Sequence, residues 1–218
     1  MTLNDTALTE DGLDLGRSAA PDRVLLIACG ALAREILAIR DLNGWDHLDL
    51  VCLPAKLHNR PEKIPDAVRD RIRRGRADGY ATVVVVYADC GTGGLLDTVC
   101  AQEGVARIDG PHCYSFFEGN EVFAAHDDEI TAFYLTDFLA RQFDTLIWKG
   151  MGFDRHPELV TMMFGNYEKV VYLAQTDDPE LEARARAGAA KLGLAFEKRQ
   201  TGYGDLPAFL ASTAPPTA

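Results

Sequence analysis

The sequence predicts an α/β protein, built as a Rossmann-like open and mostly parallel sheet with helices on both faces. Two observations favour this class. Short apolar runs rich in β-branched residues alternate along the chain with segments whose apolar residues recur at helical spacing. In addition, residues 81–88 contain four consecutive valines, which is typical of a strand that is buried on both faces of a parallel sheet.

The first half of the chain predicts three strand and helix pairs. The apolar residues 23–28 predict a strand, and a helix follows because Leu32, Ile36 and Ile39 share one face before Asn43 and Gly44 stop it. A proline-containing loop then separates the second strand from a polar helix. The further elements expected in this half are strands at 48–54, 81–88 and 106–109 and helices at about 66–76 and 94–102.

The second half begins with an aromatic-rich stretch, residues 113–128. This stretch interrupts the alternation of strands and helices and suggests an insertion over the sheet edge. Asp127 and Asp128 can cap a helix over 129–143, in which Ile130, Phe133 and Tyr134 recur at helical spacing. The last predicted elements are a strand at 169–175, a helix that starts with Pro179 and stops at Gly193, and a strand at 194–198.

We expect one α/β domain over residues 21–210, between disordered tails at 1–20 and 211–218. The segments around residues 83–108 and 170–196 both have the order strand, polar turn, helix, glycine and short strand. This pattern is compatible with two related βαβ halves, 21–125 and 126–210. The similarity is one of pattern more than of identity, so common ancestry of the halves stays open.

Charge and composition exclude several classes of function. The net charge of −11 argues against a general nucleic-acid or anionic-membrane surface, since both need clustered positive charge. The basic residues at 69–76 are read as a solvated helix face. No apolar run approaches the roughly 20 residues that cross a bilayer, and the N-terminus is acidic where a signal peptide would be basic and then apolar. We therefore expect a cytoplasmic protein.

Three of the five cysteines, Cys29, Cys90 and Cys113, stand just beyond short apolar runs. The carboxyl ends of parallel strands converge on one edge of a sheet, where ligands bind, so these three thiols are expected to meet there. The other two, Cys52 inside a strand-like run and Cys100 inside a helix, are expected to be small buried side chains. In a reducing compartment, thiols at loop positions are more plausibly metal ligands or nucleophiles than disulfides.

The chemistry is concentrated in the segment 89–94, where Cys90 follows a buried strand and precedes a helix. A cysteine at a helix N-terminus commonly has a lowered pKa, which serves metal ligation or nucleophilic attack. The segment matches neither a Walker motif nor a GxGxxG fingerprint. Small residues let the backbone approach a bound ligand closely, and the candidate ligand-binding residues here are Gly91, Thr92, Gly93 and Gly94.

Other polar residues at predicted strand ends complete the candidate site. His112 stands beside Cys113, and His58 follows the second strand, so both are candidates to assist the thiols. Thr176 follows the strand at 169–175, at the position equivalent to Cys90, and is a further candidate ligand-binding residue. Three thiolates, with or without one imidazole, suit zinc or an iron-sulfur cluster, and the sulfurs should then lie within about 4 Å of one another. Burial as plain small residues is equally compatible with the sequence.

Several strings along residues 23–206 together resemble a prokaryotic family catalogued as domain of unknown function 1638. They include YADCGTGG, GPHCYSFF, FYLTDFLARQFD and VYLAQTDD. The family carries no settled activity. Its members are often encoded beside corrinoid-dependent methyltransferases, so the resemblance implies a role in one-carbon or methylamine-type metabolism, with a corrinoid protein or a methyltransferase as partner.

Three hypotheses follow for the function. In the first, Cys29, Cys90 and Cys113 bind zinc or an iron-sulfur cluster, with His112 as a fourth or supporting group, in or beside methyl-group metabolism. In the second, Cys90 is a thiolate nucleophile, activated by His112 or His58, that acts on a small acyl or amidine substrate. In the third, the protein is a non-catalytic accessory protein that holds a small molecule or docks on a methyltransferase. A homo-oligomer is compatible with each.

Overall fold

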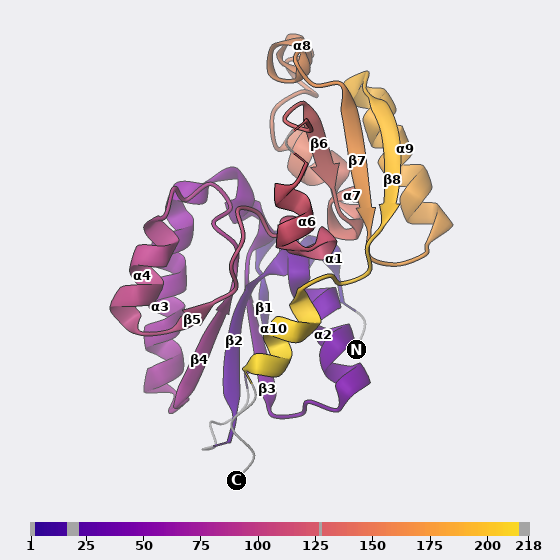
Figure 1. Cartoon of the computed structure of the whole chain (residues 1–218). Coiled ribbons are helices and arrows are strands. Elements are labelled where there is room, and N and C mark those ends of the chain that lie inside the picture. The colour runs from indigo at the N-terminus through magenta and orange to yellow at the C-terminus, as the bar shows by residue number, and fades with distance from the viewer. Residues whose placement is uncertain (1–2, 17–21, 127, 214–218) are drawn as a thin grey trace. The chain divides into compact units, whose positions relative to one another are not determined.

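A computed structural model describes residues 3–16, 22–126 and 128–213 and divides the chain into two compact units. Unit 1 consists of Met1–Cys113 together with Asp205–Ala218, and unit 2 is Tyr114–Gly204. Each unit has its own sheet, which is mostly parallel in unit 1 and parallel in unit 2 (Figure 1). The predicted α/β class is thus confirmed. The boundary falls earlier than the division near residue 125 that the sequence suggested, and the last helix of the chain belongs to unit 1.

The sheet of unit 1 has five strands in the order β1-β3-β2-β4-β5. All neighbouring pairs are parallel except β1 and β3, which are antiparallel. The central strand β2 is buried at every position, as expected for a strand covered on both faces. The strands are β1 (Leu13–Asp14), β2 (Val24–Cys29), β3 (Leu48–Leu53), β4 (Thr82–Val86) and β5 (Ala106–Arg107).

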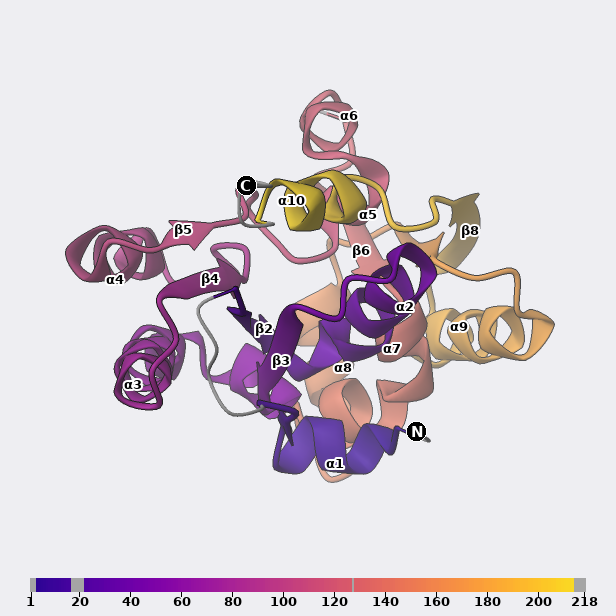
Figure 2. The same cartoon turned by 90° about the horizontal axis from the view of Figure 1, so that it is seen from below.

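Helices cover both faces of this sheet. Connections between parallel strands are right-handed. The helix between β2 and β3 therefore lies on one face of the sheet, and the helices that precede β4 and β5 lie on the other face. Figure 2 accordingly shows α2 and α10 on one side of the sheet and α3 on the other. The helices of unit 1 are α1 (Asp5–Glu10), α2 (Ala33–Asn43), α3 (Ile64–Ala77), α4 (Leu95–Glu103) and α10 (Leu206–Ser212), with 3₁₀ turns η1 (Gly30–Leu32), η2 (Ala55–Asn59) and η3 (Pro61–Lys63).

The strand order contains a topological switch point between β2 and β4. From β2 the chain moves outward to β3, then crosses back over β2 to form β4 on its other side. In open α/β sheets, ligands bind in the crevice outside the carboxyl ends of the two strands at such a point. The strand order therefore places one candidate site in unit 1, beyond the ends of β2 and β4.

The disorder expected for residues 1–20 is wrong for residues 3–16. Asn4 caps α1 by accepting hydrogen bonds from the N–H groups of Thr6 and Ala7, and Leu8 is buried. Gly30 leaves room for this helix, because a Cβ atom there would collide with the carbonyl oxygen of Leu8. A single buried turn is too short to produce a periodic pattern. Residues 1–2 and 17–20 lie outside the described part of the chain, as do residues 214–218 of the expected C-terminal tail; residues 211–213 form the end of α10 and its cap.

Unit 2 has three parallel strands in the simple order β6-β7-β8, with no switch point. Helices α7 and α9 pack together along one side of this sheet. The strands are β6 (Ala132–Leu135), β7 (Lys169–Ala174) and β8 (Ala195–Gln200), and the helices are α5 (Ser115–Glu118), α6 (Asn120–Ala124), α7 (Asp137–Arg141), the π-helical η4 (Phe143–Lys149), α8 (Glu158–Phe164) and α9 (Pro179–Leu192).

The helix predicted over 129–143 is wrong for its first half, and only residues 137–141 are α-helical. Residues 132–135 form β6, in which Tyr134 packs on one face of the sheet and Leu135 on the other, a period of two rather than 3.6. Thr136 then caps α7, because its hydroxyl accepts a hydrogen bond from Leu139 N–H. Ile130, assigned to the core-facing side of the helix, is 89% exposed. Asp127 lies outside the described residues.

The longest helices of the described residues are α3 and α9, of 14 residues each. Both carry several charged side chains. Within residues 3–16, 22–126 and 128–213, no helix is long and apolar enough to cross a membrane.

Candidate functional site

The structure places all three predicted cysteines in unit 1, two of them at the switch point. Cys29 is the last residue of β2, and Cys90 lies in the loop that follows β4. Cys113 comes from the segment after β5. Two backbone hydrogen bonds tie these loops together: Asp89 N–H donates to Gly110 O at 3.0 Å, and Cys90 N–H donates to Pro111 O at 2.9 Å. Cys90 and Cys113 therefore stand on backbone segments that are already held side by side.

The sulfurs of Cys90 and Cys113 are 3.1 Å apart. Both thiols are free, as are those of the other three cysteines. Cys29 is close enough for its charge to act on both members of the pair. Among the described residues, however, no group of three or more histidine, cysteine and acidic side chains is arranged to hold a metal ion. The structure thus brings together a thiol pair with a third thiol nearby, rather than an assembled three-ligand set.

The two members of the pair differ in acidity. The Cys113 thiol donates to the Cys90 sulfur, which lowers the pKa of Cys90, and the N–H group of Cys113 adds to this stabilisation. The same hydrogen bond, together with burial, raises the pKa of Cys113 well above its usual value. Because a thiolate and not a thiol is the nucleophile and the metal ligand, Cys90 is the reactive member of the pair.

Tyr87 lies among the three thiols, and sequence reasoning did not select it. Its side chain is only 1% exposed, and its hydroxyl group interacts with the thiol of Cys29. Burial raises its pKa, and the charges of Cys29, Cys113 and Cys90 raise it further. Burial likewise raises the pKa of Cys29 to about 11, so Cys29 is a neutral thiol at pH 7.

Cys90 adopts a strained backbone conformation. Its φ of 48° makes it the only residue other than glycine with a positive φ in the described part of the chain. Such strain persists only where the surroundings enforce it, and it is frequent at active sites. Here the strained residue lies between strand β4 and helix α4, at the edge of the sheet, and its side chain is buried.

Asp89 builds the loop that holds Cys90. Its carboxylate accepts hydrogen bonds from the Thr92 hydroxyl at 2.6 Å and from the N–H groups of Gly93 and Gly94 at 3.1 and 2.8 Å. Gly93 and Gly94 thus point their N–H groups, and Thr92 its hydroxyl, at a side chain of the loop itself. Three of them, Gly91, Gly93 and Gly94, have positive φ, which explains the glycines without a ligand. An aspartate followed by small residues is the signal for this turn.

We expect Asp89→Ala to lower the free energy of unfolding by about 1–3 kcal/mol, because three donors of the loop lose their acceptor. These hydrogen bonds lower the pKa of Asp89 below its ordinary value of 3.8 although burial opposes this. Their contribution is therefore present above the unfolded-state pKa and lost as the pH falls through the folded-state pKa. Urea unfolding at pH 7 and in acid measures both effects. The control Asp97→Ala removes an exposed partner of Arg107, and an equal loss in this variant would contradict the assignment.

The two predicted histidines lie near each other in unit 1. Surrounding protein atoms lower the pKa of His58, although part of the residue is exposed, and the charge of His112 lowers it further. His112 is half-buried; desolvation lowers its pKa, and the charge of Asp89 opposes this. Both imidazoles are therefore biased toward the neutral form, which can accept a proton or bind a metal.

Thr176 is the one predicted site residue that belongs to unit 2. Its N–H and hydroxyl groups both donate to the buried carboxylate of Asp137, at 3.0 and 2.6 Å. These contacts give Thr176 a structural role, which explains why a polar residue stands at the end of β7. Thr176 thus has a partner within its own unit and is not brought to the thiol pair by the fold of either unit.

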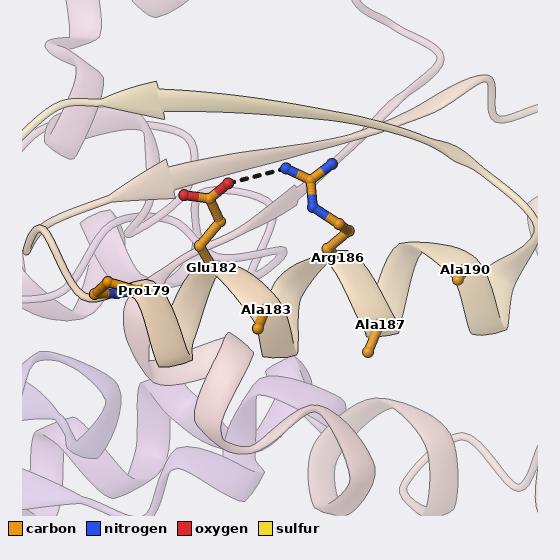
Figure 3. A pocket seen from close by; sticks show the side chains of 6 residues that line it. All are labelled: Pro179, Glu182, Ala183, Arg186, Ala187 and Ala190. Carbon is orange, nitrogen blue, oxygen red and sulfur yellow. Dashed lines mark hydrogen bonds and ion pairs between the residues drawn. The ribbon is translucent and has the colours of Figure 1, made fainter.

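A shallow groove runs along the outer side of α9 in unit 2 (Figure 3). Three alanines, Ala183, Ala187 and Ala190, line it, and the Glu182–Arg186 ion pair flanks them. It contains no unpaired buried polar group or nucleophile. The thiol pair of unit 1 is therefore the stronger candidate for chemistry.

The fold and the site define an α/β protein with a close thiol pair beside the switch point of a mostly parallel sheet. The chain belongs to the family described as protein of unknown function (DUF1638), whose family model matches residues 52–210. The match includes Cys90, Cys113, His58 and His112, and it leaves out Cys29. No curated protein and no solved structure matches the chain.

Proposed function

We propose that the protein binds one thiophilic metal ion, zinc or a single iron, through Cys90 and Cys113, with Cys29 as third ligand. The observation that carries this proposal is the 3.1 Å contact between the Cys90 and Cys113 sulfurs. Tetrahedral coordination with metal–sulfur distances near 2.3 Å separates two sulfurs by about 3.8 Å, so the pair needs to open by less than about 1 Å. An iron-sulfur cluster spreads its cysteines over separate irons, which suits two sulfurs in contact less well.

The surroundings of the pair support this proposal. Cys90 has a lowered pKa and supplies a thiolate readily, whereas Cys113 and Cys29 would lose their protons on binding the ion. Metal binding should therefore release protons and strengthen as the pH rises. His112, biased toward its neutral form, is the nearest candidate in sequence for a fourth ligand, and His58 for a supporting role.

Elemental analysis of anaerobically purified protein tests this function, with Co²⁺ as a spectroscopic probe. We expect about one zinc or iron per chain, and thiolate-to-cobalt absorption when Co²⁺ is added to metal-free protein. Both signals should disappear in Cys90→Ala and in Cys113→Ala and persist in Cys100→Ala, the control at a buried cysteine of α4. Circular dichroism checks that each variant is folded. Metal-free wild-type protein that does not bind Co²⁺, or full binding by Cys90→Ala, would refute the proposal.

We further propose that this site acts in or assists corrinoid-linked methyl transfer, in the cytoplasm. The resemblance that the sequence bears to its family supports this setting, and five free thiols suit a reducing compartment. The partner is then a corrinoid protein or a methyltransferase, and the protein is an enzyme or an accessory factor. Retention of a corrinoid protein by the immobilised chain tests the partner. If the Cys90→Ala variant no longer retains the corrinoid protein, the site itself takes part in that binding. If the wild-type chain does not retain it, the corrinoid protein is not a partner.

A second candidate is a cysteine-dependent enzyme in which Cys90 attacks a small acyl or amidine substrate. The strained φ of 48° favours it, because such a residue between a strand and a helix presents its side chain as a nucleophile. The lowered pKa of Cys90 has the same consequence. Iodoacetamide should modify metal-free protein at Cys90 first and in a one-to-one ratio at neutral pH. An inert Cys90 thiol excludes this function.

A further inference from the structure

We infer that Cys90 and Cys113 form a reversible disulfide when peroxide reaches the site, which makes the pair a redox-sensitive centre. The geometry carries the inference. The sulfurs are 3.1 Å apart, and a disulfide bond needs about 2.05 Å, so the bond requires a movement of about 1 Å. The inference goes beyond the proposed function and holds with or without a bound metal.

The backbone around the pair is already arranged for this bond. The hydrogen bonds from Asp89 to Gly110 and from Cys90 to Pro111 join the two loops directly at the cysteines. Two cysteines can be bridged without strain only where their backbones are close, and these hydrogen bonds hold the two loops side by side. Cys29 and Cys52, by contrast, lie within neighbouring strands and have no sulfur contact of this kind.

The two thiols take different roles in this reaction. The strained backbone at Cys90 marks it as the thiol that attacks the oxidant, and Cys113, in sulfur contact with it, resolves the intermediate. Because Cys90 is only 7% exposed, a small oxidant such as hydrogen peroxide fits better than a bulky disulfide.

The reaction balances in two steps. The Cys90 sulfur attacks one oxygen of hydrogen peroxide, the O–O bond breaks, and the leaving hydroxide becomes water by taking up the proton that the Cys90 thiol releases, so that Cys90 becomes a sulfenic acid. The Cys113 sulfur then attacks the Cys90 sulfur, the S–O bond breaks, and the hydroxyl group leaves with the Cys113 proton as a second water. Two thiols are oxidised by two electrons in total, and one peroxide is reduced to two waters.

Thiol counting and peptide mass spectrometry test this inference on the reduced full-length chain. Hydrogen peroxide should remove two of the five free thiols and link the peptides that contain Cys90 and Cys113, and dithiothreitol should restore all five. Cys100→Ala, the matched control, should form the same link. In Cys113→Ala, the Cys90 sulfenic acid should persist and react with dimedone.

Two results would overturn the inference. One is that folded protein still has five free thiols after oxidation, and the other is a link that joins Cys29 or Cys52 to Cys90. The wild-type and Cys100→Ala results decide it even where another variant does not fold. The metal content of the same sample, measured before oxidation, separates the two proposals: a disulfide without metal supports this inference and removes the metal function, and metal without a disulfide does the reverse.

Discussion

Asp137→Ala should lower the free energy of unfolding of unit 2 by about 3–5 kcal/mol. The Asp137 side chain is 1% exposed. Its carboxylate accepts hydrogen bonds from the Tyr172 hydroxyl at 2.6 Å, from the Thr176 N–H and hydroxyl, and from Gln175 N–H at 3.1 Å. These contacts tie the start of α7 to the end of β7. Truncation leaves several donors without an acceptor, and each buried one costs about 1–3 kcal/mol.

Urea unfolding followed by the fluorescence of Trp148, which packs against the core of unit 2, measures this loss. Hydrogen exchange should become faster in β6 and β7 before it changes in unit 1. Asp137→Asn, which keeps one acceptor oxygen, should lie between the wild type and alanine. Asp144→Ala is the control: it removes an exposed aspartate of the same unit that pairs with Lys191, and its expected cost is at most about 1 kcal/mol. A loss below about 1 kcal/mol in Asp137→Ala would show that these donors find other partners.

The elements of unit 1 could be predicted from the sequence because their signals are local. Continuous apolar runs marked β2 and β4, and the αL glycine Gly44 marked the end of α2. Cys52 and Cys100 are buried, as their places inside a strand and a helix predicted. The strand order could not be read in this way. It depends on which strands pair, and that choice is made by packing across the whole unit.

The error over residues 129–143 shows where periodicity fails. In a segment of a few residues, Ile130, Phe133 and Tyr134 fit a helical spacing as well as an alternating one. The structure resolves the choice through tertiary packing, since Tyr134 stacks on Tyr114 at 5.1 Å and Phe133 contacts Phe164 on the opposite face. The capping residue Thr136 was a signal in the sequence that a new helix begins there, after a strand.

Part of the site could be predicted from the sequence, because that part depends on local patterns. Placing Cys29, Cys90 and Cys113 beyond strands required only local patterns, and the structure brings Cys90 and Cys113 into contact. The roles of Asp89 and Tyr87 depend on which way their side chains turn, and local patterns do not encode that for a strand end. Thr176 was selected by analogy of position with Cys90, and the contact with Asp137 gives it a structural role instead.

Cys113→Ala should make Cys90 less reactive toward iodoacetamide at pH 7 by roughly tenfold or more, since a hydrogen bond to a charged group contributes about 1.5–3 kcal/mol. The Cys113 thiol is the main cause of the lowered pKa of Cys90. Without it, burial opposes the thiolate, because Cys90 is only 7% exposed, and its pKa should rise. The loss should therefore shrink as the pH approaches and passes the raised pKa, where both proteins hold Cys90 as thiolate.

The rate of alkylation of metal-free protein between pH 6 and about pH 10 checks this prediction, with the modified residue identified by peptide mass. Cys100→Ala should follow the wild-type profile, because Cys100 lies in α4 and does not contribute to the pKa of Cys90. Cys113→Ser, which keeps a hydroxyl donor at the same position, should recover part of the reactivity. Identical profiles in the wild type and Cys113→Ala would mean that the strained loop and the N–H group of Cys113 suffice to activate Cys90, and the thiol pair would lose its chemical asymmetry.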